Sequence, residues 1–352
     1  MRLSRLRWSI ALCTVPLGAL LAGPLYAQAP AVSGLSPLAL SPGGATNLTL
    51  TGANLAAPTA IWTSITAEAS LAPDVDKNGT LADKVVYRFT LAADVPVGIA
   101  ALRLATGKGV SSVRLVMIDD LKSAADSGNN HTVETAQEAS GPVAIDGATD
   151  NLQNDFYKLS AKAGQMLSVE VVAGRLGSVL DPTIRLLDAQ GRELIYSDDE
   201  PGIGGDCRFR FRIPADGVYT LELRDVRYQG GAGHFYRLRI GDFPFASVAY
   251  PMGVQAGTSA TLAAAGSAVD GAAPVSFTAS PDRAGDAVPV NFKFPNGQGS
   301  AFATVLIARG REIAETEPND DPASAPTVQM ATELPAALNG RFDKPGDRDV
   351  FS

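Results

Sequence analysis

The sequence predicts an all-β protein built from tandem β-sandwich modules. Apolar and polar side chains alternate with a period of two in many short runs, which places one set on a buried face and the other outside. Glycine and proline are frequent, with 35 and 23 residues, and turns containing them separate the runs. A helix would need apolar residues at i, i+3 and i+4, and the runs lack that spacing. We therefore expect almost no helix after residue 27.

Residues 1–27 have the order of a secretory signal peptide. Three arginines come first, an apolar run from Trp8 to Ala22 follows, and small residues lead up to Ala27. The run has about 15 residues, which is shorter than the roughly 20 that a membrane span needs. We therefore expect an exported protein, periplasmic, cell-surface or extracellular, with no transmembrane segment after the signal peptide.

Charge and cysteine usage limit the partners and the crosslinks of the mature chain. The formal net charge of −8 becomes −11 once the three arginines of the signal are removed. An acidic surface repels phosphate backbones, so nucleic acid is not an expected partner. Cleavage would also remove Cys13, which leaves Cys207 as the one thiol and excludes an internal disulfide.

Residues 28–120 are predicted to form a first small sandwich. The runs Asn47–Gly52 and Val85–Leu91 alternate, and a Pro-Gly-Gly turn at 42–44 precedes the first of them. The stretch from Ser36 to Leu55 resembles the immunoglobulin-like, plexin and transcription factor (IPT/TIG) domains. That resemblance implies an immunoglobulin-like β-sandwich for this region.

Residues 121–245 contain the clearest strands and are predicted to form a second sandwich. Ile184–Leu187 and Glu193–Tyr196 flank the turn 188–191 and predict a hairpin. The small polar stretch 121–130 is interpreted as a linker. Residues 246–312 are again short runs and turns, and predict a third, small β-domain.

Five arginines are predicted on the outer face of two strands of the second sandwich. The face is either a patch for an anionic polymer or a set of cross-strand pairs with acids such as Glu222, and we expect the pairs. The arginines are Arg208, Arg210, Arg212, Arg237 and Arg239.

The last 40 residues repeat the start of the second sandwich. Glu317–Asp320 precedes Gly346–Phe351 much as Asn129-Asn130 precedes Gln153–Tyr157, and both copies pass through a glycine, Gly340 or Gly147. We therefore expect residues 313–352 to be the truncated start of a second copy, and the sequence to be a fragment of a longer polypeptide.

Both copies resemble the bacterial pre-peptidase C-terminal (PPC) domain. The second copy has the entry motif Glu317-Pro318-Asn319-Asp320 and an Asp-x-Asp at 347–349. The first copy has the later landmarks, which are Asp181-Pro182, Tyr196-Ser197-Asp198-Asp199 and Asp216–Leu221. The resemblance implies a jelly-roll-like β-sandwich of the kind appended to secreted proteases and other exported proteins. Some such domains bind calcium, and some bind insoluble polymers such as collagen.

The start of the second copy is the predicted metal site. Calcium takes six to eight oxygen ligands, and oxygen-bearing side chains are concentrated here. The alternative is a solvated acidic linker. The candidate ligands are Glu315, Glu317, Asn319, Asp320, Asp347 and Asp349. In the first copy, Ala125 and Ser127 are aligned with Glu315 and Glu317, so no such site is expected there.

A second acidic group, formed by Asp198, Asp199, Glu200 and Asp206, is either a calcium loop or an exposed polar loop, and we expect the polar loop.

No catalytic constellation is visible in the chain. There are two histidines, no Gly-x-Ser-x-Gly motif, and Cys207 has the core-facing register of its strand. We expect a non-catalytic multi-module binding, adhesion or scaffold protein whose partner is an extracellular polymer or a cell-envelope component. The alternative is the non-catalytic N-terminal part of a secreted protease or other hydrolase whose catalytic domain lies beyond residue 352.

Overall fold

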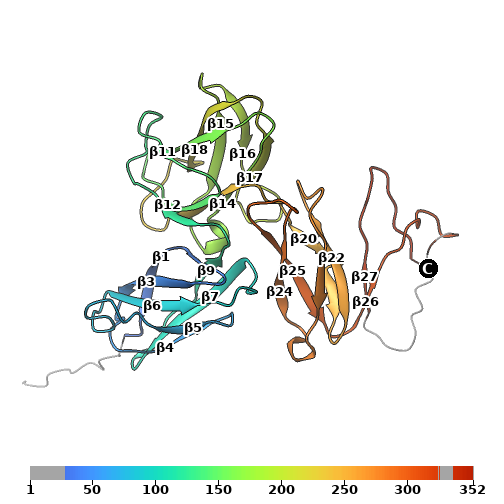
Figure 1. Cartoon of the computed structure of the whole chain (residues 1–352). Coiled ribbons are helices and arrows are strands. Elements are labelled where there is room, and N and C mark those ends of the chain that lie inside the picture. Colours follow the sequence, from blue (N-terminus) through green and yellow to red (C-terminus); the bar gives the residue numbers. More distant parts are fainter. Residues whose placement is uncertain (1–27, 324, 326–335, 352) are drawn as a thin grey trace, which may run out of the picture.

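The computed structural model describes residues 28–323, 325 and 336–351, so the predicted signal peptide lies outside the described residues. Within them the regular structure is strand, apart from two short 3-10 turns, η1 (Gly174–Leu176) and η2 (Pro281–Arg283). The all-β prediction is therefore confirmed. The same residues contain no helix that is both long and apolar enough to cross a bilayer. Figure 1 shows three separate sandwiches and a short two-stranded ribbon beyond the third.

The N-terminal module packs two sheets around one core. The first sheet has the order β1-β3-β6-β5, and the second has the order β2-β9-β7-β4 with β8 paired to β7. The bounds are β1 Ala31–Ser36, β2 Ala39–Leu40, β3 Ala45–Ala53, β4 Pro58–Thr63, β5 Glu68–Leu71, β6 Lys84–Thr90, β7 Gly98–Thr106, β8 Gly109–Val110 and β9 Arg114–Ile118. The predicted alternation is clear in β6, where Val85, Tyr87 and Phe89 all enter the core.

The central module is a sandwich of two five-stranded sheets. Their orders are β10-β12-β19-β14-β17 and β11-β13-β18-β15-β16. The bounds are β10 Ser123–Ala125, β11 Gln137–Glu138, β12 Val143–Ala148, β13 Asp155–Ala161, β14 Met166–Val172, β15 Pro182–Leu187, β16 Glu193–Ser197, β17 Arg208–Arg212, β18 Gly217–Asp225 and β19 Phe235–Gly241. The predicted hairpin is β15–β16. The linker interpretation of residues 121–130 is wrong, because Leu121 is buried and β10 pairs with β12 in parallel.

The third module is smaller and is followed by the C-terminal ribbon. Its sheets are β20-β22-β23 and β21-β25-β24, and the ribbon pairs β26 with β27 in parallel. The bounds are β20 Val248–Tyr250, β21 Gly253–Gln255, β22 Ser259–Ala265, β23 Val275–Thr278, β24 Ala287–Phe292, β25 Ala301–Ala308, β26 Arg311–Ala314 and β27 Ala336–Asn339.

A buried carboxylate, Asp119, joins the N-terminal module to the central one. It directly follows β9, and its side chain lies between two arginines of β19. Arg237 Nε lies 2.7 Å from Asp119 Oδ2, and Arg239 Nη2 lies 3.1 Å from Oδ1. All three side chains are 0 % exposed. Burial alone would raise the pKa of Asp119, but the two guanidinium groups lower it below its ordinary value, so this carboxylate stays charged.

Further contacts connect the same arginines to the rest of the fold. Arg239 Nη1 lies 2.6 Å from Glu170 on β14, and Arg239 Nη2 donates to the carbonyl of Ser300 in the third module. Arg237 Nη1 lies 2.6 Å from Asp146, whose other oxygen accepts the backbone N–H of Leu38 in the N-terminal module. One hydrogen-bonded group of charges therefore contacts all three modules.

These contacts decide between the two interpretations of the outer arginines. The polymer-patch hypothesis is wrong, because Arg208, Arg237 and Arg239 are buried and of the five only Arg212 is exposed. Cross-strand pairing is correct, but the main acid is Glu170 of β14, since Glu222 lies in the other sheet and pairs with Arg185. Neighbouring modules cover a face that an isolated sandwich would leave in water.

We predict that Asp119→Asn lowers the free energy of unfolding by about 3–5 kcal/mol, because it leaves two buried guanidinium groups without their shared counter-charge. Urea denaturation followed by circular dichroism measures the change. The matched control is Asp74→Asn, which removes an exposed carboxylate 3.9 Å from Arg88 and should cost less than about 1 kcal/mol. Equal effects of the two substitutions would contradict this account of the junction.

Candidate metal centre

Backbone pairing in the C-terminal ribbon brings the predicted ligands together. Ala314 pairs with Asn339, and the next backbone N–H, that of Glu315, donates to the Asn339 carbonyl. Farther along, the carbonyl of Asn319 accepts the N–H of Val350. Residues 315–320, here called the C-terminal entry segment, are therefore held between the end of β27 and residues 347–351.

Three carboxylates converge in this arrangement. Carboxylate oxygens of Glu315, Glu317 and Asp349 all lie within 4.8 Å of one another. Asn319 is 0 % exposed, and its side-chain oxygen has no hydrogen-bond partner. One oxygen of Asp349 is also buried without a hydrogen-bond partner, whereas Asp347 Oδ1 lies 3.8 Å from Lys344 Nζ. Asn130 and Asp155 of the central module keep an unpartnered oxygen as well, so the additional carboxylate of Glu317 is what distinguishes the C-terminal group and makes it suitable for a cation.

The pKa shifts around these carboxylates also indicate a negative charge that is not fully compensated. Burial and the nearby charge of Glu315 raise the pKa of Asp349. The hydroxyl of Tyr250, in the third module, donates to Glu315 Oε1 at 3.0 Å, and burial together with this bond raises the pKa of Tyr250 to about 12. The Arg341 guanidinium offsets the charge of the group only in part, because its Nε pairs with Asp343 while its charge also acts on Glu315. Like charges at this range repel unless a cation separates them.

Of the six predicted ligands, the structure gathers Glu315, Glu317, Asn319 and Asp349, and it directs Asp320 and Asp347 toward Lys344. Asp320 Oδ1 accepts the backbone N–H of Arg348, and its Oδ2 lies 3.3 Å from Lys344 Nζ. Two other residues complete the site. Gly340 allows the close approach, since a Cβ there would lie 2.6 Å from Asp349 Oδ2. Tyr250 could not be found from sequence, because its distance along the chain gives no signal.

The structure also corrects the alignment of the two copies by one residue. In the central module, Ala125 pairs with Asp146, the N–H of Asp126 donates to the Asp146 carbonyl, and the Asn130 carbonyl accepts the N–H of Phe156. These bonds match those of Ala314, Glu315 and Asn319. The residue that corresponds to Glu315 is therefore Asp126, not Ala125, and Gly128, not Ser127, corresponds to Glu317.

The second acidic group is only partly the predicted one. Asp206 is buried and accepts the backbone N–H groups of Ala173 and Gly174 at η1. Glu200 leaves the group as well, because it pairs with Arg208.

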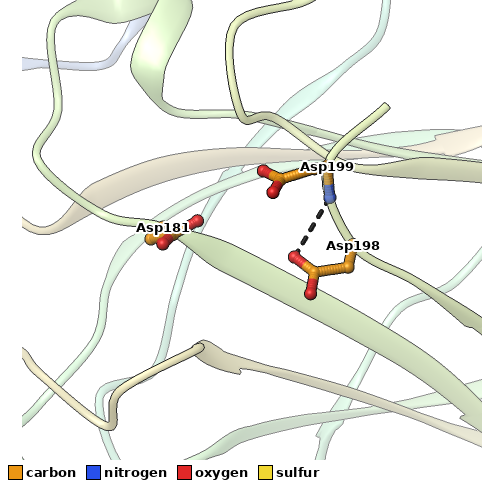
Figure 2. Close-up of side chains that lie close together, drawn as sticks. All are labelled: Asp181, Asp198 and Asp199. Carbon is orange, nitrogen blue, oxygen red and sulfur yellow. Dashed lines mark hydrogen bonds between the residues drawn. The ribbon is translucent and has the colours of Figure 1, made fainter. Parts of the chain in front are cut away.

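A different aspartate takes their place. Asp181 approaches Asp198 and Asp199, and Figure 2 shows the three carboxylates with the bond from the Asp199 N–H to Asp198. Burial, then the charges of Asp199 and Asp198, raise the pKa of Asp181. No buried side-chain oxygen of these three residues lacks a partner, so this group provides less reason than the C-terminal one to expect an ion.

Neither histidine of the described chain is placed for nucleophilic catalysis. Both ring nitrogens of His234 are buried without a hydrogen-bond partner, and His131 contacts Asp155, Asp150 and a backbone carbonyl. The Cys207 thiol is fully buried, and burial raises its pKa well above the ordinary value, which makes it unreactive.

Comparison with solved structures gives matches of low overall similarity. The pre-peptidase C-terminal domain of a Bacillus anthracis collagenase is 16% identical with a TM-score of 0.25, and the match covers 30% of this chain and 93% of that one. PliG, a periplasmic lysozyme inhibitor of Aeromonas hydrophila, is 17% identical with a TM-score of 0.22, covering 34% and 92%.

Comparison of sequences is more specific. A probable subtilase-type serine protease of Deinococcus radiodurans is 40% identical over 70 residues, which are 20% of this chain and 9% of that protein. Residues 153–225 match the family model described as the bacterial pre-peptidase C-terminal domain. This range runs from just before β13 to the end of β18. The central module of this chain therefore carries a bacterial pre-peptidase C-terminal domain.

Proposed function

We propose that the chain is the non-catalytic binding or scaffold part of an exported protein, and that a calcium ion ties its C-terminal entry segment to residues 347–349. The observation that carries the proposal is the convergence of the Glu315, Glu317 and Asp349 carboxylates beside Asn319, whose buried side-chain oxygen has no hydrogen-bond partner. The same segment has the PPC entry motif. The central module, whose entry segment carries fewer acids, would be the calcium-independent copy.

Calcium suits the donor set better than other common ions. All the donors are oxygens, without histidine or cysteine, which disfavours zinc and copper. Calcium accepts six to eight such ligands in flexible geometry, whereas magnesium requires a tighter octahedron. The residues that would hold it are Glu315, Glu317, Asn319 and Asp349, and Asp320 and Asp347 remain predicted further ligands. When bound, the ion would offset the mutual repulsion of the carboxylates, and so would stabilise the folded segment.

The partner in this proposal is an extracellular polymer or a cell-envelope component. Support comes from the predicted export signal, the acidic mature chain and the family of the central module. The buried junction at Asp119 also suits a scaffold, because it fixes neighbouring modules in one arrangement.

We predict that terbium, used as a luminescent stand-in for calcium, binds the purified chain and is excited through Tyr250. Energy transfer requires a nearby aromatic ring, and the Tyr250 hydroxyl lies 3.0 Å from Glu315 Oε1. Calcium should displace terbium at concentrations at which magnesium does not. Glu317→Gln should weaken terbium binding at least about tenfold, because ligand charge sets the affinity of such sites.

Two further variants make the terbium experiment specific. Asp270→Asn removes an exposed carboxylate of the third module and should leave binding unchanged. Asp320→Asn should weaken binding less than Glu317→Gln, because Asp320 is occupied by Lys344 and Arg348. Terbium binding that survives Glu317→Gln, or no binding at all, would leave the entry segment as a solvated linker.

A second candidate function is the non-catalytic part of a secreted protease. The observation that favours it is the 40% identity over 70 residues with the subtilase-type protease of Deinococcus radiodurans. The two candidates differ in the function of a longer polypeptide. Both propose that the present chain is non-catalytic.

We predict that the chain as given hydrolyses neither peptide nor ester substrates. The reason is the placement of His131, His234 and Cys207 described above. Broad peptidase and esterase assays on the purified chain are the measurement. Turnover that disappears in His234→Ala but survives in the matched variant His131→Ala would contradict the prediction.

A further inference from the structure

The central entry segment, residues 126–131, and residues 153–155 correspond to the six predicted ligand positions of the C-terminal copy. Three of these six positions carry the same kind of side chain in both copies. Asp126, Asn130 and Asp155 stand where the other copy has Glu315, Asn319 and Asp349. Three positions differ: Gly128, His131 and Gln153 replace Glu317, Asp320 and Asp347. One core position also differs, because Tyr157 stands where the C-terminal copy has Phe351. The central copy therefore has fewer carboxylates and an additional hydroxyl.

The additional hydroxyl belongs to a chain of four oxygen-bearing groups. Tyr157 Oη lies 2.8 Å from Asp126 Oδ1 and 2.5 Å from Tyr236 Oη. Tyr236 Oη lies 2.6 Å from Asp155 Oδ2. Gly147 lets Tyr236 reach this place, since a Cβ there would lie 2.5 Å from the Tyr236 hydroxyl. The tyrosines thus bridge the two carboxylates that correspond to Glu315 and Asp349.

The two tyrosine hydroxyls have too few protons to give each contact in this row of four groups a hydrogen-bond donor. Three oxygen–oxygen contacts need one proton each, and the two phenols supply two. If both carboxyls were ionised, the contact between Tyr157 and Tyr236 would bring two lone pairs together at 2.5 Å. A third proton, carried by one of the carboxyls, gives every contact a donor: carboxyl to Tyr236, Tyr236 to Tyr157, and Tyr157 to the other carboxylate.

The surroundings identify Asp155 as the protonated carboxyl. Its side chain is 1 % exposed, whereas Asp126 is less buried and already accepts the N–H of Gly128 on its other oxygen. Burial is the main cause that raises the pKa of Asp155 to about 6, and the charge of Asp126 adds to it.

The remaining groups that face Asp155 act in the opposite direction. The Tyr236 hydrogen bond lowers the pKa of Asp155, and so does His131, whose Nδ1 lies 3.3 Å from Asp155 Oδ1. The hydroxyl of Tyr157 contacts that of Tyr236. On the far side of the imidazole, Asp150 lies 3.7 Å from His131 Nε2. These opposing contributions leave the proton exchangeable at mildly acidic pH.

We propose that the central module closes its entry segment with a bound proton, shared along Asp155, Tyr236, Tyr157 and Asp126, in place of a metal ion. The central module then responds to pH rather than to divalent cations. The geometry of the central module alone carries this proposal, which does not require the calcium site of the C-terminal segment to exist.

The sign of the pH dependence follows from the direction of the shift. A carboxyl whose pKa is higher in the folded state binds more protons folded than unfolded, so its contribution to stability is lost as pH rises from its ordinary pKa of 3.8 through about 6. Asp155→Asn is permanently neutral, and its side-chain amide can donate to Tyr236 as the protonated carboxyl does. The melting temperatures of this variant and the parent should be equal below about pH 4, and the variant should melt several degrees higher above about pH 6. A difference that is constant over this range would overturn the proposal.

A second measurement keeps the proposal testable if Asp155→Asn fails to fold. Carbon-detected NMR of the aspartate carboxyls in the parent should show one that titrates near pH 6. Tyr157→Phe should move that titration to lower pH, because it leaves only the contact between Tyr236 and Asp155, for which the Tyr236 hydroxyl supplies the proton. Addition of calcium should not shift it. A calcium-dependent shift would show that a metal shares this site, whereas failure of terbium to bind the C-terminal segment would leave the result unaffected.

Discussion

The structure depends most on a carboxylate that is buried between two guanidinium groups, Asp119 between Arg237 and Arg239. Each of these charges costs several kcal/mol to remove from water, and only close pairing offsets that cost. The pairing is possible in one arrangement of the chain. It requires the end of β9 to lie over β19, the Ser300 carbonyl to approach from the third module, and Leu38 to approach from the N-terminal one. A set of modules is thereby held as one unit without a disulfide.

Buried carboxylates recur at the places where segments of this chain are joined, and the partner differs at each. At Asp119 the partner is a pair of arginines. At Asp155, in our proposal, it is a proton shared with two tyrosines. In the C-terminal segment Arg341 pairs with Asp343, Lys344 pairs with Asp320 and Asp347 rather than with the three converging carboxylates, and Phe351 lacks the hydroxyl of Tyr157. That difference is the physical reason for proposing a metal ion there and not in the central module.

Sequence patterns predicted what depends on neighbouring residues and missed what depends on other modules. Alternation predicted β6 and the β15–β16 hairpin because each has one core face and a local turn. It could not show that the outer face of β19 is buried, since the covering residues lie in other modules. The stretch 121–130 looked like a linker because small polar residues also suit a short edge strand. The one-residue error at Asp126 arose because only backbone hydrogen bonds fix the register of the two copies. The convergence of acids at the C-terminal entry segment was predictable from their density in the sequence, whereas the approach of Tyr250 was not.

Calorimetric unfolding of the whole chain tests most directly whether charge pairing unites the modules. If the group around Asp119 couples them, the N-terminal and central modules should unfold in one transition. At a pH at which the parent chain is stably folded, Asp119→Asn should split that transition into two. Two separate transitions in the parent chain, or a single one that persists in Asp119→Asn, would show that the modules are stable independently and that the buried charges do not hold them together.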